Sequence, residues 1–492
     1  MKACSSKALV VAGLLCLATS VLSAQTLTAL ADFGGGSEGT GPIGIIQASN
    51  GNFYGVTRFA GSGPYCSLSG GCGTIFEITS KGKVTTFYNF CSQKSCTDGA
   101  IANGLVQASN GNFYGTTKLR GAHYMGTIFE LTPSGKFTTL YSFCAQANCP
   151  DGSGPVGRLV QGIDGDLYGL TNSGGSGKGC RHGCGTMFKL TLSGQFTSAF
   201  SFCAATNCVD EGRNPQQGLT VSPNGDLYGT TFGGGRPQEG IIFKITPSGS
   251  LTKLYNFYSQ PNGADGWDAQ APLTLGGDGN FYGTTEGGGT FKNGTFFKIT
   301  PTGQYSVLYN FCSQTNCVDG VTPSGPIAWG SDGNLYGTAS GGGSTQSAGT
   351  AFKITPSGQY TLLYTFCSQV LCADGIGPSG LIQDTNGNFY GATQGGGGQT
   401  CGCGTVYSLS MGLEPFVEAE PGFAPVGKRV AILGNGLSST SSVTFNGTPA
   451  SFKVGSGTYL LATVPAGATT GPIEVTTPNG TLSSNVAFQV IP

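Results

Sequence analysis

Apolar residues recur along most of this chain in short runs that alternate with polar residues and are separated by glycine-rich turns. One stretch shows the pattern, with runs at Leu105–Ala108, Asn112–Thr117, Gly126–Thr132 and Lys136–Phe143. An alternating period bounded by Asn-Gly and Pro-Ser-Gly is typical of β-strands joined by tight turns, and no helical period is present. The pattern predicts an all-β fold built from four-stranded units.

A signature of Asn or Asp, then Phe or Leu, then Tyr-Gly marks each unit and recurs at intervals of 54 or 60 residues. Its tyrosines are Tyr54, Tyr114, Tyr168, Tyr228, Tyr282, Tyr336 and Tyr390. Repeats of this length match a four-stranded propeller blade rather than a solenoid turn. Seven copies therefore predict a seven-bladed β-propeller over residues 25–412.

The last copy has only three strand-like runs, at Leu381–Asp384, Asn388–Thr393 and Gly404–Ser410. The missing fourth run is found near the other end of the chain, where Thr26–Phe33 has the pattern of a fourth strand. We expect this segment to complete the last blade and close the ring, which removes exposed sheet edges.

The period changes after Pro415, and residues 413–492 form a second predicted domain. The expected strands are Arg429–Ile432, Ser442–Phe445, Tyr459–Val464, Pro472–Thr476 and Val486–Val490. Several of them alternate apolar and polar residues, so the segment predicts a small Ig-like β-sandwich.

Two resemblances follow from these motifs. The repeated NFYGTT and GTIFELTPSGKFTTLYSF segments resemble the GloVer-type tandem repeat of secreted bacterial proteins, over Thr26–Ser410. That resemblance implies an extracellular propeller. Gly427 with Gly434, the Phe445-Asn446-Gly447 turn and Gly471–Val475 resemble the IPT/TIG domain, which implies an extracellular spacer or interaction module without catalytic residues.

The first 24 residues have the pattern of a secretory signal peptide: Lys2 and Lys7, then an apolar run over Ala8–Ala18, then small residues up to Ala24. The apolar run is too short for a membrane span, and no later run is long enough. We expect an extracellular protein, with attachment to the cell surface left open.

Composition excludes several classes of function. Of the 492 residues 10% are charged and the net charge is -1, which argues against a nucleic-acid partner. The chain has two His and four Met, so we expect no cofactor and no metal site. The Gly-Gly-Gly runs lack the Lys-Ser/Thr of a phosphate loop.

Sixteen cysteines remain beyond residue 24, in close pairs that predict disulfides in an exported protein. Five pairs share a C-x4-C spacing: Cys91 with Cys96, Cys144 with Cys149, Cys203 with Cys208, Cys312 with Cys317, and Cys367 with Cys372. Three pairs are closer in sequence: Cys66 with Cys72, Cys180 with Cys184, and Cys401 with Cys403. Whether Cys401 and Cys403 pair is left open, because a one-residue spacer strains the bridge.

Alternating strands place all the long, cysteine-bearing loops on one face of the predicted propeller, and such loops commonly carry binding residues. On this face Arg181, His182, Asp265 and Trp267 are the candidate ligand contacts. The recurrent loop acids Asp98, Asp151, Asp210, Asp265, Asp319 and Asp374 either form a ring of carboxylates for cations or acid–base chemistry, or cap their own loops.

One column of the innermost strands carries Gln47, Gln107, Gln161 and Gln383, with Val221, Leu275 and Trp329 at the other three places. These amides either line a polar channel for a sugar or peptide, or pack between blades with bonds to the backbone. No catalytic residues are assigned. The first functional hypothesis is a binding or structural protein that recognises a glycan or protein through the disulfide-stapled loop face. The alternative is an extracellular carbohydrate-active lyase or hydrolase that uses the central channel. The oligomeric state is not determined by the sequence.

Overall fold

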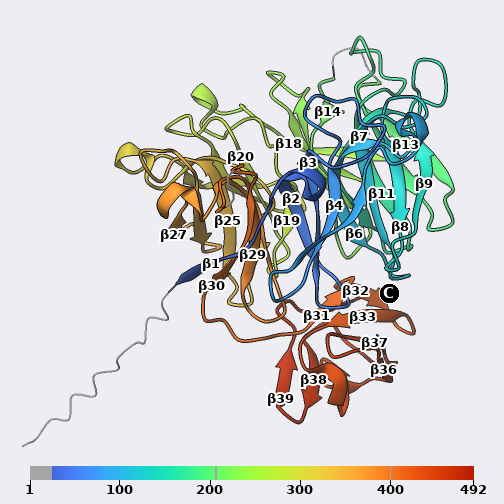
Figure 1. Cartoon of the computed structure of the whole chain (residues 1–492), viewed down its shortest axis with the longest axis vertical. Coiled ribbons are helices and arrows are strands. Elements are labelled where there is room, and N and C mark those ends of the chain that lie inside the picture. The colour runs from blue at the N-terminus through green and yellow to red at the C-terminus, as the bar shows by residue number, and fades with distance from the viewer. Residues whose placement is uncertain (1–24, 205–207, 399–400, 492) are drawn as a thin grey trace, which may run out of the picture.

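The computed structural model describes residues 25–204, 208–398 and 401–491, and nearly all of its regular structure is β-strand (Figure 1). The predicted signal peptide lies outside these residues. The helices are single 3-10 turns: η1 (Gly36–Glu38), η2 (Lys94–Cys96), η3 (Pro261–Gly263), η4 (Thr315–Cys317), η5 (Val370–Cys372) and η6 (Leu437–Ser439). None of these described helices has the length and apolar character needed to cross a membrane.

Seven antiparallel sheets, numbered here 1 to 7, follow one another over the described residues 26–410. Sheet 1 contains β2 (Thr40–Gln47), β3 (Phe53–Phe59), β4 (Thr74–Ile78) and β5 (Val84–Asn89). Sheet 2 contains β6 (Ala100–Gln107), β7 (Phe113–Leu119), β8 (Thr127–Leu131) and β9 (Phe137–Ser142). Sheet 3 contains β10 (Ser153–Gln161), β11 (Leu167–Ser173), β12 (Thr186–Leu190) and β13 (Phe196–Ser201).

In sheets 4 and 6 the first strand is split into two pieces that both pair with the second strand. Sheet 4 contains β14 (Arg213–Pro215), β15 (Thr220–Val221), β16 (Leu227–Gly233), β17 (Ile241–Ile245) and β18 (Leu251–Asn256). Sheet 5 contains β19 (Thr274–Leu275), β20 (Phe281–Thr285), β21 (Thr295–Ile299) and β22 (Tyr305–Asn310). Sheet 6 contains β23 (Val321–Pro323), β24 (Ala328–Trp329), β25 (Leu335–Gly341), β26 (Thr350–Ile354) and β27 (Tyr360–Thr365).

Sheet 7 unites the two ends of the repeat region. Its strands are β28 (Ile376–Gln383), β29 (Phe389–Gly395), β30 (Thr405–Ser410) and β1 (Thr26–Asp32). Strand β1 pairs antiparallel with β30, with Thr26 opposite Ser410 and Leu27 opposite Leu409. The N-terminal segment thus supplies the strand that the last repeat lacks, as its sequence pattern predicted.

The signature tyrosines pack each sheet against the next. The ring pairs Tyr54–Phe113, Tyr228–Phe281, Tyr336–Phe389 and Tyr390–Phe53 have centroids 4.4, 3.9, 3.9 and 4.3 Å apart. In the remaining repeats the tyrosine shares a buried cluster with the leucine at the same place: Tyr114 with Leu167, Tyr168 with Leu227, and Tyr282 with Leu335. The glycine after the tyrosine is required by close packing, because a Cβ on Gly115 would lie 2.5 Å from Cζ of Phe129.

The C-terminal domain, residues 417–491, is a small β-sandwich. One sheet contains β31 (Glu418–Glu420), β33 (Arg429–Leu433), β37 (Tyr459–Thr463) and β36 (Phe452–Val454). The second contains β35 (Thr448–Pro449), β34 (Ser442–Phe445), β38 (Ile473–Thr477) and β39 (Gly480–Ser483), and β32 (Phe423–Pro425) pairs parallel with β40 (Gln489–Ile491). Val430, Ile432, Leu460, Ile473 and Val475 are central members of its core.

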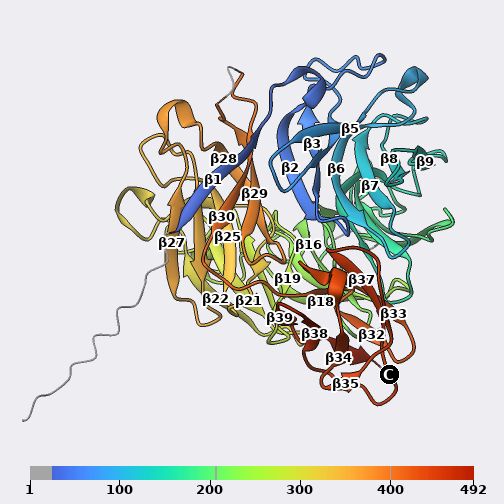
Figure 2. The ribbon, with the colours of Figure 1, turned by 60° about the horizontal axis from the view of Figure 1, so that its bottom comes forward.

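This domain covers one side of the repeat region (Figures 1 and 2). Thr458 Oγ1 donates a hydrogen bond of 2.8 Å to the Ser49 carbonyl, and Asn435 Nδ2 donates one of 3.0 Å to Thr385 Oγ1. Ser49 and Thr385 lie in the tight turns between the first and second strands of sheets 1 and 7. We call this side the turn face and the opposite side, formed by the long connections, the loop face.

Candidate functional site

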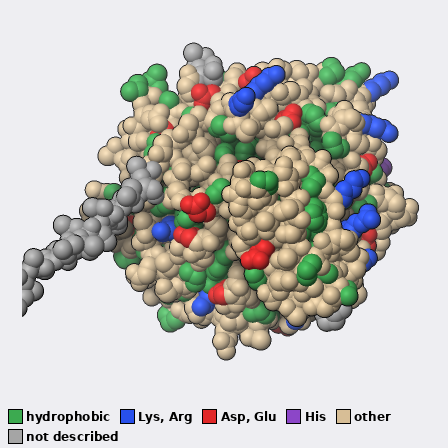
Figure 3. Space-filling model, turned by 90° about the horizontal axis from the view of Figure 1, so that it is seen from below, with side chains coloured by type: hydrophobic (Ala, Val, Ile, Leu, Met, Phe, Trp, Pro, Cys, Tyr) green, Lys and Arg blue, Asp and Glu red, His purple; other side chains and the backbone are tan. Residues whose placement is uncertain are grey.

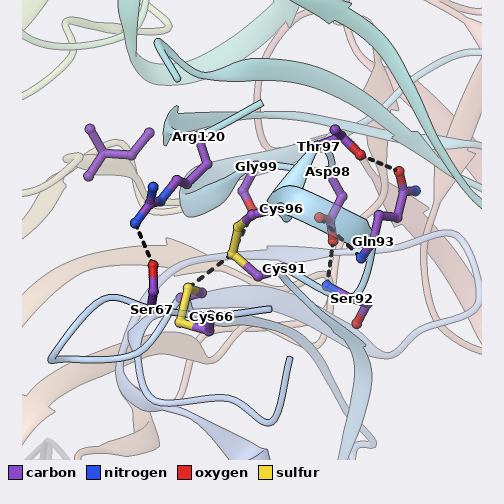
Figure 4. Close-up of a disulfide and its surroundings, with 12 residues drawn as sticks. Cys66, Ser67, Cys91, Ser92, Gln93, Cys96, Thr97, Asp98, Gly99 and Arg120 are labelled. Atoms are coloured by element: carbon purple, nitrogen blue, oxygen red, sulfur yellow. Dashed lines mark hydrogen bonds between the residues drawn. A yellow bond between two sulfur atoms is a disulfide. The ribbon is translucent and has the colours of Figure 1, made fainter. Parts of the chain in front are cut away.

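Disulfide bonds close the long connections of the loop face. Figure 4 shows Cys91 bonded to Cys96 in the first loop of this kind, with Cys66 beside them. The Cys66–Cys72 bridge abuts this one, because the sulfur of Cys72 lies 3.0 Å from that of Cys91. The structure contains the seven predicted bridges 66–72, 91–96, 144–149, 180–184, 203–208, 312–317 and 367–372, and it also joins Cys401 to Cys403, the pair that the sequence left open.

Most of the recurrent loop aspartates fix the loops from inside. Asp98 is fully buried and accepts a hydrogen bond of 2.8 Å from the Tyr88 hydroxyl. It also accepts one of 2.9 Å from the Ser92 backbone N–H (Figure 4). Burial raises the pKa of Asp98, and these hydrogen bonds partly oppose the rise. The same tyrosine and backbone contacts recur at Asp151, Asp265, Asp319 and Asp374. These carboxylates cap their own loops and do not form a ring around a channel.

Asp265 is therefore wrong as a candidate ligand contact. Its side chain has no exposed surface, and its Oδ2 accepts hydrogen bonds from the Tyr255 hydroxyl and the Ser259 backbone N–H, both at 2.8 Å. An acid before glycine at the end of such a loop is drawn inward, because the loop's own N–H groups need an acceptor.

The third repeat departs from this arrangement. Phe200 stands where the other loops have the tyrosine, and Glu211 replaces the capping aspartate by accepting a hydrogen bond from the Ala204 N–H. The neighbouring Asp210 is displaced outward, with its side chain 80% exposed, and pairs with Lys253 at 2.6 Å. Asp210 is thus a surface residue, unlike its five counterparts.

In the fourth repeat an aromatic pair takes the place of the disulfide. Tyr258 and Gly263 occupy the two cysteine positions, and the rings of Tyr258 and Trp267 lie 5.3 Å apart. A Cβ on Gly263 would lie 2.6 Å from Trp267, so the indole fills the space of the missing bridge. Lys292 Nζ lies 5.5 Å from the centre of the Trp267 ring. Trp267 is half-buried and packs on its own loop instead of projecting as a stacking platform.

Arg181 and His182 are exposed near the tip of the loop closed by Cys180 and Cys184. The structure keeps them on the loop face, but it does not bring them together with Asp265 or Trp267 into one site. The His182 carbonyl accepts a hydrogen bond of 2.8 Å from the Gly174 N–H, which anchors the loop.

Exposed large apolar side chains gather on the loop face. Among the described residues, all but Ile163, Val426 and Val486 lie there: Phe59, Tyr65, Leu119, Tyr124, Met125, Phe232, Tyr258, Phe291, Val370, Leu371 and Ile376. Val370 and Leu371 are the most exposed, at 85% and 90%. Among the described residues, exposed large apolar side chains are thus more frequent on the loop face than on the turn face.

Leu371 also has an unfavourable backbone conformation. Its φ is 56°, in the left-handed region that asparagine tolerates and leucine does not. Other loops have Ser95, Asn148, Asn262 and Asn316 at this place, with φ between 57° and 64°. An exposed leucine held at this angle is less favourable than the asparagine found at the same place in other loops.

Charge on the loop face is unbalanced. Its exposed basic residues are Arg58, Lys94, Lys118, Lys178, Arg181, Arg236 and Lys292, whereas Asp210 and Glu239 are the exposed acids among the described residues. The loop face therefore combines exposed apolar side chains with more exposed basic residues than acidic ones.

On the turn face, the glutamine column joins successive repeats. Gln107 Oε1 accepts a hydrogen bond of 2.8 Å from the Ser49 N–H, and Gln161 and Gln383 do the same for Ser109 and Ser331. Gln47 bonds to Thr385, which links sheet 1 to sheet 7. The glutamines thus bond to the backbone of a neighbouring sheet, and Gln47, Gln107 and Gln161 also line the larger cavity, so both alternatives drawn from the sequence hold in part.

A cavity of about 790 Å³ lies between these turns and the C-terminal domain, and a second of about 370 Å³ continues between the innermost strands. Arg158 of β10 and Glu418 and Glu420 of β31 line both cavities. Glu418 is half-buried, whereas Arg158 and Glu420 expose much of their surface to the cavity. Figure 3 shows the molecule from this side, which carries few charged side chains.

The surroundings of the cavity raise the pKa values of its two acids. Burial raises the pKa of Glu418, the charges of Glu420 and Asp384 raise it further, and Arg158 opposes the rise. Burial also raises the pKa of Glu420, again against Arg158. The carboxyl groups can accept hydrogen bonds from the hydroxyl groups of a ligand, and the guanidinium can donate to an anionic or hydroxyl oxygen.

The sequence did not lead to a prediction of this cluster, although one signal for Arg158 was present. Directly before the buried Leu or Ile of each first strand stand Gly44, Gly104, Arg158, Gly218, Pro272, Pro326 and Gly380, and all seven line the smaller cavity. Arg158 alone has a long polar side chain. Glu418 and Glu420 lie outside the repeats, so no internal comparison marks them.

Comparison with known proteins gives two family matches. The Gloeobacter/Verrucomicrobia repeat matches residues 18–209, 65–263 and 258–416, and the IPT/TIG domain matches residues 417–490. No curated protein matches the chain.

Two solved structures share the architecture. A fungal alcohol oxidase of the AA5 family, in complex with copper, is 13% identical with a TM-score of 0.52, covering 95% of this chain and 99% of that one. The extracellular domain of a hybrid two-component system from B. thetaiotaomicron is 11% identical with a TM-score of 0.50, covering 95% of this chain and 61% of that one. At such identities the likeness shows an all-β, propeller-like fold alone.

Proposed function

Because the chain belongs to the Gloeobacter/Verrucomicrobia repeat family and carries an IPT/TIG domain, we propose that it is an extracellular binding protein. In this proposal the seven sheets are the blades of a closed propeller, and the loop face recognises a protein partner. The pairing of β1 with β30 and the bond from Gln47 to Thr385 support closure, since both join the last repeat to the first end of the chain.

Secretion is supported by the eight disulfides, because such bridges persist in oxidising compartments. The signal-peptide pattern of residues 1–24 agrees with it. In this proposal the bridges hold the long loops in one conformation, so that binding costs less conformational entropy.

The concentration of exposed apolar side chains on the loop face carries the proposal of a protein partner. Aliphatic groups such as Val370 and Leu371 do not stack on sugar rings, but they fit apolar pockets of proteins. Arg120 lies 5.9 Å from the centre of the Tyr124 ring, an Arg–Tyr pairing of residue types enriched in protein interfaces. The exposed basic residues of the loop face favour a partner surface that carries acidic residues beside its apolar ones.

The test is capture of cell-surface and secreted proteins of the source organism on the immobilised chain, compared with two single variants. Tyr124→Ala should abolish capture of a specific protein, because it removes an exposed ring on the loop face. Ile163→Ala, which removes an exposed side chain on the turn face, should leave capture unchanged. Binding to a glycan array that Tyr124→Ala abolishes, without any captured protein, would replace the protein partner by a glycan.

A further inference from the structure

Arg158 occupies a place where the repeat itself requires no side chain. The six equivalent positions are glycine or proline, and a Cβ on Gly104 would lie 3.3 Å from the Arg158 Cβ. The innermost strands therefore approach closely around the cavity, and the arginine fits because its neighbour is glycine. An arginine at a position where the other repeats have glycine or proline points to a function of the cavity rather than of the fold.

The charged groups of the cavity lack protein partners. Within the described chain, Arg158, Glu418 and Glu420 have no side-chain hydrogen bond, and no ion-pair partner lies within 4.0 Å. All three groups face the cavity, so water or a ligand in it solvates their charges. The three side chains approach from two domains, so a molecule between them would contact both.

The surrounding walls are mixed. Leu159, Val221, Leu275 and Phe423 supply apolar surface, and Tyr459 supplies a half-buried ring. The volume of about 790 Å³ is in the range of small-molecule sites. The cavity presents one cation and two acids, so it does not select a ligand charge of one sign, whereas hydroxyl groups can donate to carboxylates and accept from a guanidinium.

We infer that the cavity between the propeller and the C-terminal domain binds a neutral polyhydroxylated molecule of mono- or disaccharide size, with Arg158, Glu418 and Glu420 as its polar contacts. This site is separate from the loop face and does not depend on the partner proposed there. The ligand is held between the two domains.

The test is isothermal titration calorimetry of the full chain with maltose, cellobiose, lactose, sucrose, trehalose and chitobiose, and with glycylglycine as a zwitterionic comparison. At least one sugar should bind, and glycylglycine should not. Arg158→Gly, which restores the residue of four other repeats, and Glu420→Gln should each weaken binding about tenfold or more. Arg429→Gln and Glu474→Gln, exposed on the C-terminal domain, are matched controls and should leave binding unchanged.

Thermal unfolding of each variant should stay close to that of the wild type, which separates lost binding from lost folding. The inference is overturned if none of the six sugars binds, if glycylglycine binds instead, or if Arg158→Gly and Glu420→Gln bind sugar as the wild type does.

Discussion

The ring of Tyr390 in sheet 7 lies against the ring of Phe53 in sheet 1, with centroids 4.3 Å apart and planes inclined by 33°. The same contact joins Tyr54 to Phe113 between sheets 1 and 2. The contact between the ends of the repeat region thus has the same chemistry as a contact between neighbours. This equivalence is what the closed-propeller proposal requires.

Phe33, which directly follows β1, gives a first prediction. It is fully buried and lies edge-on against Phe76 of sheet 1, with centroids 4.9 Å apart. Phe33→Ala should lower the free energy of unfolding by about 3 to 5 kcal/mol, because it leaves a cavity where the two ends of the repeat region meet. Chemical denaturation measures this, with the exposed Phe59→Ala as control. A loss below about 1 kcal/mol, as at surface positions, would contradict the role of the N-terminal segment in completing the repeat region.

Reduction of the disulfides should loosen the loops selectively. The bridges close short loops on the loop face, whereas the sheets are held by buried aromatic clusters. Hydrogen exchange should therefore accelerate in the loops at 91–96 and 312–317 after reduction. The loop at 258–263, which uses Tyr258 and Trp267 in place of a bridge, is the internal control and should not change. Equal acceleration in all three loops would contradict this assignment.

Asp384 predicts a dependence of stability on pH. It is buried in the first turn of sheet 7, its Oδ1 has no hydrogen-bond partner, and burial raises its pKa from 3.8 to about 6. A raised pKa means that the folded state binds the proton more tightly, so this residue's contribution to stability is present below pH 4 and is lost as the pH rises through about 6.

Asp384→Asn should remove the loss of stability that ionisation of Asp384 causes at high pH. The shift of about two pH units corresponds to at most roughly 3 kcal/mol of unfolding free energy, gained by the variant at pH 8 and absent at pH 3. Urea unfolding at a series of pH values measures it. The raised pKa values of Glu418 and Glu420 act in the same direction, and burial still raises both in the variant, although Glu418 loses the contribution of the Asp384 charge. A variant destabilised at pH 8 would show that the carboxylate is required in its charged form.

Much of the fold follows from local pattern. The strands, the Asn-Gly and Asp-Gly turns and the pairing partner of Thr26–Phe33 could be predicted because each depends on residues within one repeat, seen seven times. The place of Gln107 in one column of the innermost strands was predicted because the same position recurs in each repeat. Asp265 was misplaced, because loop sequence alone does not tell whether a carboxylate faces water or the loop's own N–H groups.

The cavity could not be predicted from local pattern, since it depends on how two domains dock. Arg158 and Glu420 are about 260 residues apart in sequence, and only the three-dimensional arrangement brings them to one space. Leu371 was predictable in principle. Aligning the C-x4-C loops places it against Asn148 and Asn316, which shows an apolar residue at a left-handed position.

Leu371→Asn tests the central claim, that the loop face is shaped for a protein partner, most directly. Asparagine suits the φ of 56°, so the variant should unfold at a higher temperature than the wild type, while it removes the most exposed apolar side chain of the loop face. We predict raised thermal stability together with lost capture of the protein partner, measured on the same preparation. Raised stability with partner binding undiminished would contradict the claim.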